Sequence, residues 1–179
     1  MKATGIVRRI DELGRVVIPK EIRKTLRLRV GDPLEIYTDS GELLLKKYSP
    51  INSLESFSKD LCEAINLQTG KTVLICDMDE VLHSKGQSCK DFDKKRISLE
   101  LEKTILMRKT VKNCAQDGDS LTAITDFDPS GFTSELIVPI LCQGDALGAI
   151  VLLSKNDKIT QEDVSVCKFC EDFLQRQFS

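Results

Sequence analysis

The fold of the amino-terminal part of the chain is set by residues 2–19, which read KATGIVRRIDELGRVVIP. Alternating apolar side chains predict a strand over residues 5–10, and the sequence DELG at 11–14 predicts a turn into a second strand over 15–18. Pro19 ends this strand, and its fixed φ angle suits the first turn of a helix. The stretch therefore predicts two strands joined by a turn and followed directly by a helix.

The residues that come next complete a small unit. Residues 20–26 favour a short helix, because Ile22 and Leu26 lie four apart on one inward face. Two more strands are expected over residues 34–38 and 42–47, joined by a tight turn that contains Gly. The order is β-β-α-β-β within fifty residues.

This unit is too small to cover its own apolar side chains. A unit of about fifty residues buries only about 60% of the surface that its unfolded chain exposes. Its first 50 residues nevertheless contain 16 Val, Ile and Leu side chains. We therefore expect a homodimer through residues 1–50, in which the two chains interleave their strands.

After residue 50 the pattern becomes that of a second domain with helices and strands. Asn52 is expected to cap a helix, because apolar residues at helical spacing follow it. Helices are predicted over residues 52–65, 98–108 and 161–178. Strands are predicted over residues 72–76, 80–84, 135–142 and 147–154. Thr160 is expected to cap the last helix. The two long apolar strands predict a buried central hairpin. The predicted class is α+β, with domains at 1–50 and 71–179 and a linker or dimerisation helix at 51–70.

Charge is divided unequally between these parts. Residues 1–50 hold 11 Lys and Arg against 7 Asp and Glu, a net +4, whereas the remainder holds 15 against 21, a net −6. The basic side chains of residues 1–50 must lie together on the exposed surface of this unit, because its apolar side chains form the core. Arginine binds phosphate and guanine edges with two parallel hydrogen bonds, which favours an anionic partner, although a merely solvated basic face has the same pattern.

Residues 2–19 and 21–26 closely resemble the start of AbrB-type transition-state regulators, and residues 31–36 and 45–51 resemble a sporulation regulator of that family. The resemblance implies a swapped-hairpin β-barrel, made from two interleaved chains, that binds double-stranded DNA through one face. The family's basic contacts fall at positions matching Arg8, Arg15, Arg23 and Lys24, with Arg9 beside them. Lys24 stands where some relatives carry arginine, so it keeps the charge but lacks the fork that reads a base.

The second half resembles a GAF-like sensor domain, on residues 138–140, 144 and 147–151. This resemblance implies flanking dimerisation helices and a homotetramer. The resemblance of the whole chain to the sporulation regulator implies a transcriptional regulator of sporulation genes, both activator and repressor, located in the cytoplasm of the forespore. Residues 85–95 and 117–133 match no ligand motif, so the small molecule that would modulate such a domain stays unidentified. No cofactor and no metal are expected.

Other motifs are weaker. Cys167 and Cys170 form one Cys-x-x-Cys pair, but zinc needs four ligands and His83 is the only histidine of the chain. Residues 126–131 imitate the opening of a calcium loop, yet the twelfth position is Ile137 and not an acid. Neither a phosphate-binding loop nor a serine nucleophile elbow is present. No enzyme is expected.

Two alternatives to a DNA-binding regulator stay open. Swapped-hairpin domains also occur in antitoxins, which bind a protein partner. A thiol-based redox sensor would instead use Cys167 or Cys170. The seven cysteines are odd in number, which favours reduced thiols, and the sequence shows neither a secretory signal nor an apolar stretch of about 20 residues, so no membrane partner is expected.

Overall fold

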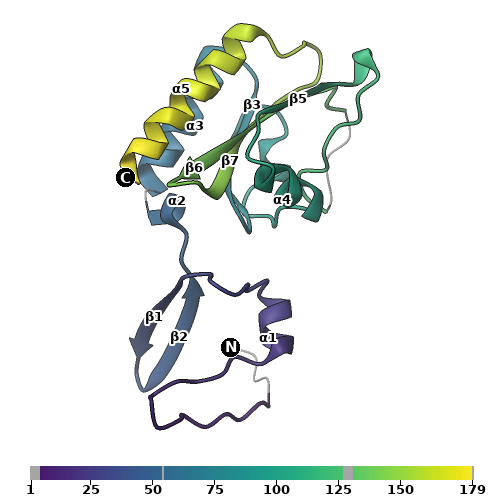
Figure 1. Ribbon diagram of the computed structural model, residues 1–179. Coiled ribbons are helices and arrows are strands. Elements are labelled where there is room, and N and C mark those ends of the chain that lie inside the picture. The colour runs from purple at the N-terminus through teal and green to yellow at the C-terminus, as the bar shows by residue number, and fades with distance from the viewer. Residues whose placement is uncertain (1–4, 54, 127–130, 179) are drawn as a thin grey trace. The chain divides into compact units, whose positions relative to one another are not determined.

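The computed structural model describes residues 5–53, 55–126 and 131–178, and the chain divides into two compact units, Met1–Tyr48 and Ser49–Ser179 (Figure 1). The first unit contains α1 (Lys20–Thr25) and the antiparallel strands β1 (Leu34–Asp39) and β2 (Glu42–Lys47). The hairpin turn uses Ser40 and Gly41, both with positive φ, which is the conformation that two-residue hairpins favour.

The two strands predicted over residues 5–10 and 15–18 are not formed in the single chain. The turn between them is present, since the Asp11 amide donates to Arg15 O at 3.1 Å and the Gly14 amide donates to Asp11 O at 3.0 Å. A strand requires a neighbour to complete its hydrogen bonds. The expected neighbour is the second copy of the chain, which the single chain cannot replace.

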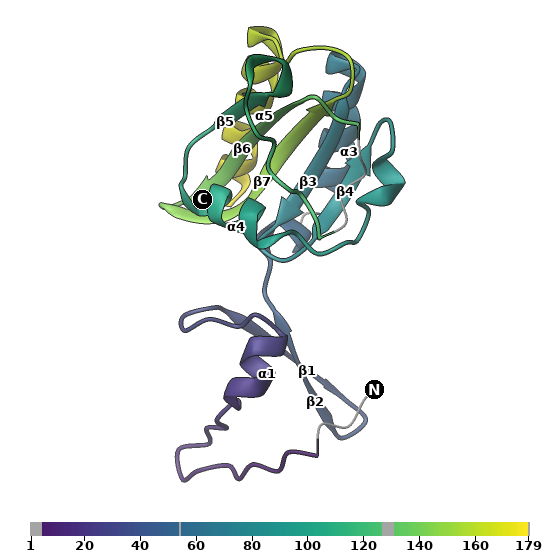
Figure 2. The same ribbon diagram turned by 90° about the vertical axis from the view of Figure 1, so that its right-hand side faces the viewer.

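The second unit is built on a five-stranded antiparallel sheet in the order β4-β3-β7-β6-β5. Its elements are α2 (Pro50–Ser53), α3 (Glu55–Thr69), β3 (Thr72–Asp77), β4 (Val81–Lys85), η1 (Cys89–Asp91), α4 (Leu99–Leu106), β5 (Val111–Cys114), η2 (Ala115–Asp117), β6 (Ser134–Cys142), β7 (Asp145–Ser154) and α5 (Gln161–Gln177). Helices α3 and α5 lie side by side on one face of the sheet and α4 lies on the other (Figures 1 and 2). The α+β class is confirmed.

Two apolar clusters fill the space between these layers. On one face, Leu136 and Leu152 pack with Cys62 of α3 and Leu174 of α5. On the other face, Ile137 and Val151 pack with Leu101 and Ile105 of α4. The hairpin β6–β7 is central and buried on both sides, as its near-continuous apolar sequence predicts.

The start of the helical segment differs from the prediction. Helix α2 begins at Pro50, so Asn52 lies inside it and is not the cap that the sequence predicts. Proline is favoured at the first position of a helix because its missing N–H would have no partner there. Ile51 of α2 is fully buried beside Gly148, where an added Cβ would lie 2.8 Å from Ile51 Cδ1 and would overlap Cys76 O. Leu54, expected on the apolar stripe of this helix, lies outside the described residues.

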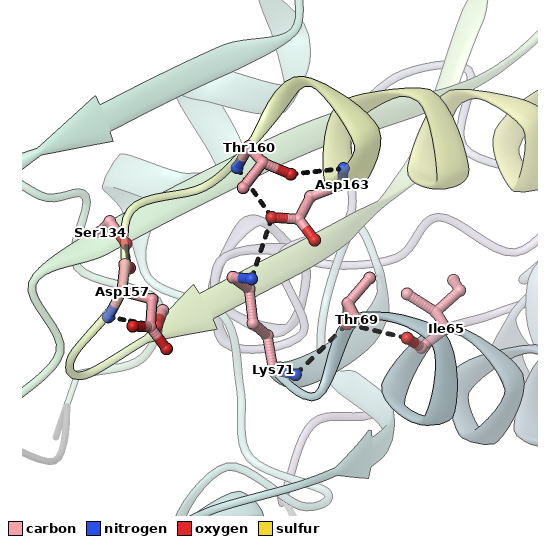
Figure 3. Close-up of polar contacts among 8 residues, drawn as sticks. Ile65, Thr69, Lys71, Ser134, Asp157, Thr160 and Asp163 are labelled. Carbon is pink, nitrogen blue, oxygen red and sulfur yellow. Dashed lines mark hydrogen bonds and ion pairs between the residues drawn. The ribbon is translucent and has the colours of Figure 1, made fainter.

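A buried polar junction joins the end of α3, the start of β3 and the start of α5 (Figure 3). Lys71 Nζ lies 3.0 Å from Asp163 Oδ2, and the two side chains are 11% and 7% exposed. The same Oδ2 accepts from the Thr160 amide at 2.7 Å, and Thr160 Oγ1 accepts from the Asp163 amide. Thr69 Oγ1 donates to Ile65 O at 2.8 Å and accepts from the Lys71 amide. The predicted cap at Thr160 is confirmed.

Candidate nucleic-acid interface

The five predicted DNA-binding side chains are all exposed. Arg8 and Arg9 precede the turn at residues 11–14, and Arg15 follows it. Arg23 and Lys24 lie in the last turn of α1, where positive charge also suits the helix dipole. The first unit therefore presents them from two neighbouring segments of the chain, the turn region and the short helix.

Asp11 fixes the turn and holds Arg15. Asp11 Oδ1 accepts from the amides of Leu13 and Arg15 at 2.9 and 2.8 Å, and Oδ2 accepts from Arg15 Nε at 2.8 Å. The hydrogen bond from the Arg15 amide, followed by that from its side chain, holds the pKa of Asp11 below its ordinary value. A guanidinium has five N–H donors, so Arg15 can keep Nε on Asp11 while its two terminal nitrogens bind a phosphate.

Helix α1 has little of its own to hold it. It is six residues long, its N-cap residue is Pro19 with no side-chain hydrogen bond, and none of its residues is buried. Ile22 is half-buried, but Leu26, predicted to face inward, is 47% exposed. The two side chains line an apolar hollow of about 250 Å³ together with Ile18, Leu28, Leu34 and Leu45. The inward face of the helix thus lacks its cover in the single chain.

The whole first unit shows this lack of cover. Among the described residues 5–48, Pro19 alone is buried. Large apolar side chains stand exposed along its length: Val7, Ile10, Leu13, Val16, Val17, Leu26, Val30, Ile36, Leu43, Leu44 and Leu45. Monomeric soluble proteins rarely expose contiguous apolar surface of this extent. The exposure supports the predicted association of two copies.

Helix α5 is one of the flanking helices for which the GAF resemblance implies dimerisation, and only part of its apolar stripe is exposed. Cys170 and Leu174 are buried in the unit's own core, whereas Phe169 is 72% exposed. Phe173 is exposed in part, and its ring lies 5.3 Å from that of Phe57 on α3. Only the Phe169 and Phe173 side of the stripe is therefore available to a second sensor unit.

The cysteines have the environment of packing residues. Burial raises the pKa of Cys167 to about 12 and also raises the pKa of Cys170. Thiols with such values stay protonated at neutral pH, and the thiolate is the form that reacts. Among the residues that the structure describes, no group of three or more His, Cys, Asp or Glu side chains is placed to hold a metal ion. The described part of the chain also contains no helix of the length and apolar character that a membrane span needs.

The calcium-like segment at residues 126–131 lies largely outside the described residues. His83, predicted as a strand residue, lies half-buried in β4.

Two family descriptions match the chain. Residues 53–179 match "Stage V sporulation protein T C-terminal, transcription factor", and residues 7–53 match "Antidote-toxin recognition MazE, bacterial antitoxin". Stage V sporulation protein T of Bacillus subtilis (strain 168) is 46% identical over 178 residues, which cover 99% of this chain and 98% of that protein. The transition state regulatory protein AbrB of the same organism is 44% identical over 88 residues, which cover 49% of this chain and 92% of AbrB.

A solved structure resembles the second unit. The GAF domain of an Acinetobacter phosphoenolpyruvate-protein phosphotransferase is 15% identical, with a TM-score of 0.57, and the match covers 70% of this chain and 84% of that structure. At this identity the likeness concerns the fold alone, and it confirms the predicted GAF-like architecture.

Proposed function

The chain belongs to the family of stage V sporulation protein T, with an amino-terminal part of the AbrB type, and we propose that it binds operators of sporulation genes through Arg8, Arg9, Arg15, Arg23 and Lys24. It is a DNA-binding transcriptional regulator and not an enzyme. The proposed DNA-binding face is supported by one observation. All five basic side chains are exposed on a unit whose apolar side chains are not covered in the single chain.

Dimerisation brings the two sets of bases together. When two copies interleave, the apolar side chains exposed in one chain are buried against the other, and the charged side chains stay on the outside. Ten basic groups then face one DNA duplex. Contacts to phosphate fix the position of the dimer, and a few arginines read bases or groove shape. Lys24 has a single ammonium in place of a fork, so its role is that of a phosphate contact.

The second unit joins two such dimers. Phe169 and Phe173 of α5 offer an apolar surface that a second sensor unit covers in the tetramer. Two DNA-binding dimers in one tetramer then act at neighbouring sites, and the second contact is strengthened by effective concentration rather than by new interactions. A ligand of the GAF-like unit shifts this arrangement only as far as it prefers one placement of the dimers over the other.

A salt titration tests the DNA proposal. Four phosphate contacts per chain in a dimer give a slope of about −7 for log affinity against log salt concentration, at about −0.9 per neutralised phosphate. Fluorescence anisotropy with a labelled duplex measures the slope. A slope near zero contradicts the proposed face.

Light scattering tests the assembly. We expect the mass of a tetramer for the full chain. The variant Phe169→Asp should have the mass of a dimer, because a carboxylate is costly to bury without a partner. A variant that retains the tetramer mass contradicts the assigned surface, and Glu162→Gln at an exposed position of the same helix is the matched control.

An antitoxin-type module is the second candidate, because residues 7–53 match the MazE description. Antitoxins of this kind usually present an unfolded tail to the toxin, whereas this chain continues into a unit with two complete apolar clusters. The polypeptide composition of the purified native assembly distinguishes the regulator from the antitoxin-type module. A single polypeptide supports the regulator, and a second small protein in fixed stoichiometry supports the antitoxin.

A further inference from the structure

Strand β6 carries a carboxyl group into the core of the second unit. Glu135 is fully buried and lies directly opposite Leu153 of β7, on the face of the sheet that α4 covers. A buried carboxylate is stable only when hydrogen bonds or a cation replace the water that it has lost. The hydrogen-bond partners of its two oxygens therefore determine whether the folded chain favours the neutral acid or the carboxylate.

The two oxygens have unequal surroundings. Oε1 accepts three hydrogen bonds, from Asn113 Nδ2 at 2.7 Å, Thr122 Oγ1 at 2.8 Å and the Thr122 amide at 2.9 Å. Oε2 is equally buried, and within the described residues no group donates a hydrogen bond to it. Since the donors occupy Oε1, a proton on this carboxyl group belongs on Oε2.

The loop that supplies two of these donors is also tied to α4. The Ala123 amide donates to Glu100 Oε2 at 3.2 Å, and Ser98 Oγ donates to Ala123 O. The Ser98 amide donates to Ile124 O at 2.9 Å. Ile124 itself is buried in the core cluster of α4. The middle of the loop of residues 119–125 is thus held on β6 by Glu135 and on α4 by Glu100 and Ser98, while its ends are held by Asp119, which accepts from the Cys114 amide at 3.0 Å, and by the bridge between Thr125 and Ile97.

The surroundings of Glu135 penalise a negative charge. Its neighbours are Asn113 from β5, Leu153 from β7, Thr122 from the loop and Glu100 from α4. Burial is the largest effect and raises the pKa of Glu135 above 4.5, the hydrogen bonds from Thr122 and Asn113 oppose it, and the charge of Glu100 raises it further. The neutral acid therefore fits the closed loop better than the carboxylate does.

We propose that Glu135 is a proton-linked latch, which holds the loop of residues 119–125 on the sheet while it is protonated and releases the loop when it ionises. Ionisation leaves Oε2 charged and without water. Because the loop contacts this carboxyl group through Thr122, opening of the loop is the movement that we expect to return water to it. The latch gives the second unit a conformational response on the α4 face, opposite the face that α3 and α5 cover (Figure 2).

Hydrogen exchange of the full chain tests the latch. In the wild type, the opening equilibrium of residues 119–125, corrected for intrinsic exchange, should rise with pH by at most about tenfold per pH unit between 4.5 and the higher pKa that Glu135 has in the closed state, and should level off above that pKa. In Glu135→Gln, which cannot ionise, the rise should be absent. Glu63→Gln, at a partly exposed glutamate that pairs with Lys85, is the control and should keep the wild-type rise. A flat wild-type profile, or the same rise in Glu135→Gln, overturns the proposal.

The proton on Glu135 also determines how the free energy of unfolding of the second unit changes with pH. Between 4.5 and its higher folded pKa, Glu135 holds a proton in the folded chain and lacks it in the unfolded chain. The free energy of unfolding of the second unit therefore falls as pH rises through this window, and the wild type should lose stability relative to Glu135→Gln.

A direct titration keeps the test decisive if Glu135→Gln does not fold. The side-chain carboxyl carbon of Glu135, followed by nuclear magnetic resonance in the wild-type chain with labelled glutamate, should titrate with a midpoint above 4.5. A midpoint at or below 4.5 overturns the latch.

Discussion

The two units of the chain differ in whether one copy of the sequence completes its core. In the second unit, apolar side chains on both faces of the sheet are fully buried, and so is Ile51 of α2 at the beginning of the unit. In the first unit, only Pro19 among the described residues 5–48 is buried, although the sequence there is richer in Val, Ile and Leu than that of the second unit. The difference teaches that an apolar sequence specifies burial without specifying which chain supplies the cover.

The helices of the two units show the same difference. Helix α5 has 17 residues and a capping box formed by Thr160 and Asp163. Helix α1 has six residues and no side-chain cap. Isolated helices shorter than about 12 residues are marginal in water, so α1 depends on packing for its stability. We expect that packing to come from the second copy.

The largest effect should follow from a charge placed in the uncovered core. Leu45→Asp should abolish the dimer and weaken DNA binding by at least about 100-fold, because burial of an unpaired carboxylate costs several kcal/mol and each 1.4 kcal/mol is about tenfold. Sedimentation and DNA titration measure the two effects. Leu106→Asp in α4 is the control, since Leu45 and Leu106 are 38% and 43% exposed in the single chain. Equal effects of both changes would show that Leu45 lies outside the interface.

The buried ion pair of the second unit offers the next largest effect. Asp163→Ala leaves Lys71 buried without its partner, and the loss of one member of such a pair typically costs about 3–5 kcal/mol. The chain has no Trp and two Tyr, both in the first unit, so tyrosine fluorescence follows that unit while circular dichroism follows both. We expect the unfolding transition of the second unit alone to shift in urea.

The control for this change is an exposed ion pair of the same unit. Asp117→Ala removes the partner of Lys158, whose Nζ lies 2.6 Å from Asp117 Oδ1 with both side chains more than half exposed. Exposed pairs of this kind contribute little, so no shift should be measurable. A comparable shift in the two variants would mean that burial of the Lys71 pair has no special energetic weight.

Sequence patterns predict the elements that a single chain completes. Strand β2, the long strands β6 and β7 and the cap at Thr160 agree with prediction, because apolar runs and capping residues act locally. Strand β5 was missed. Its four residues, VKNC, place two polar side chains side by side and show no apolar alternation, and the strand exists because Val111 pairs with Ile137 and Cys114 with Ser134. Pairing across such a distance in sequence leaves no local signal.

The candidate sites divide in the same way. The bases of the first unit were found from a sequence motif, while their joint geometry depends on a second copy that a single sequence does not contain. Glu135 was missed, although a signal was present: it is the one acid in the apolar run ELIVPI at residues 135–140. Only the packed structure shows that Thr122 and Asn113 meet on one of its oxygens.

Removal of single bases should have a smaller effect than loss of the dimer. Arg23→Ala should weaken specific binding by about 1–3 kcal/mol if Arg23 reads a base, whereas Lys24→Ala should reduce the salt slope by about 1 and weaken binding to all sequences alike. Anisotropy titrations on operator and random duplexes distinguish the two. Arg176→Ala, at an exposed position of α5, is the control. Operator affinity that survives Arg23→Ala and Arg15→Ala unchanged would place the DNA face elsewhere.

The smallest expected effect comes from removal of the helix cap at Thr160. It tests whether capping stabilises the second unit, as the comparison of α1 and α5 implies. Thr160→Ala removes the acceptor of the Asp163 amide and should lower the free energy of unfolding by about 1 kcal/mol, as is typical for a lost N-cap. Thr160→Ser keeps the hydroxyl and should retain most of that stability. The unfolding of the second unit, followed by circular dichroism, measures both. If serine is as damaging as alanine, the methyl group of Thr160 stabilises α5 by packing, and the cap does not account for its stability. The tyrosine signal should stay unchanged in both variants, because the first unit takes its stability from another chain and not from this helix.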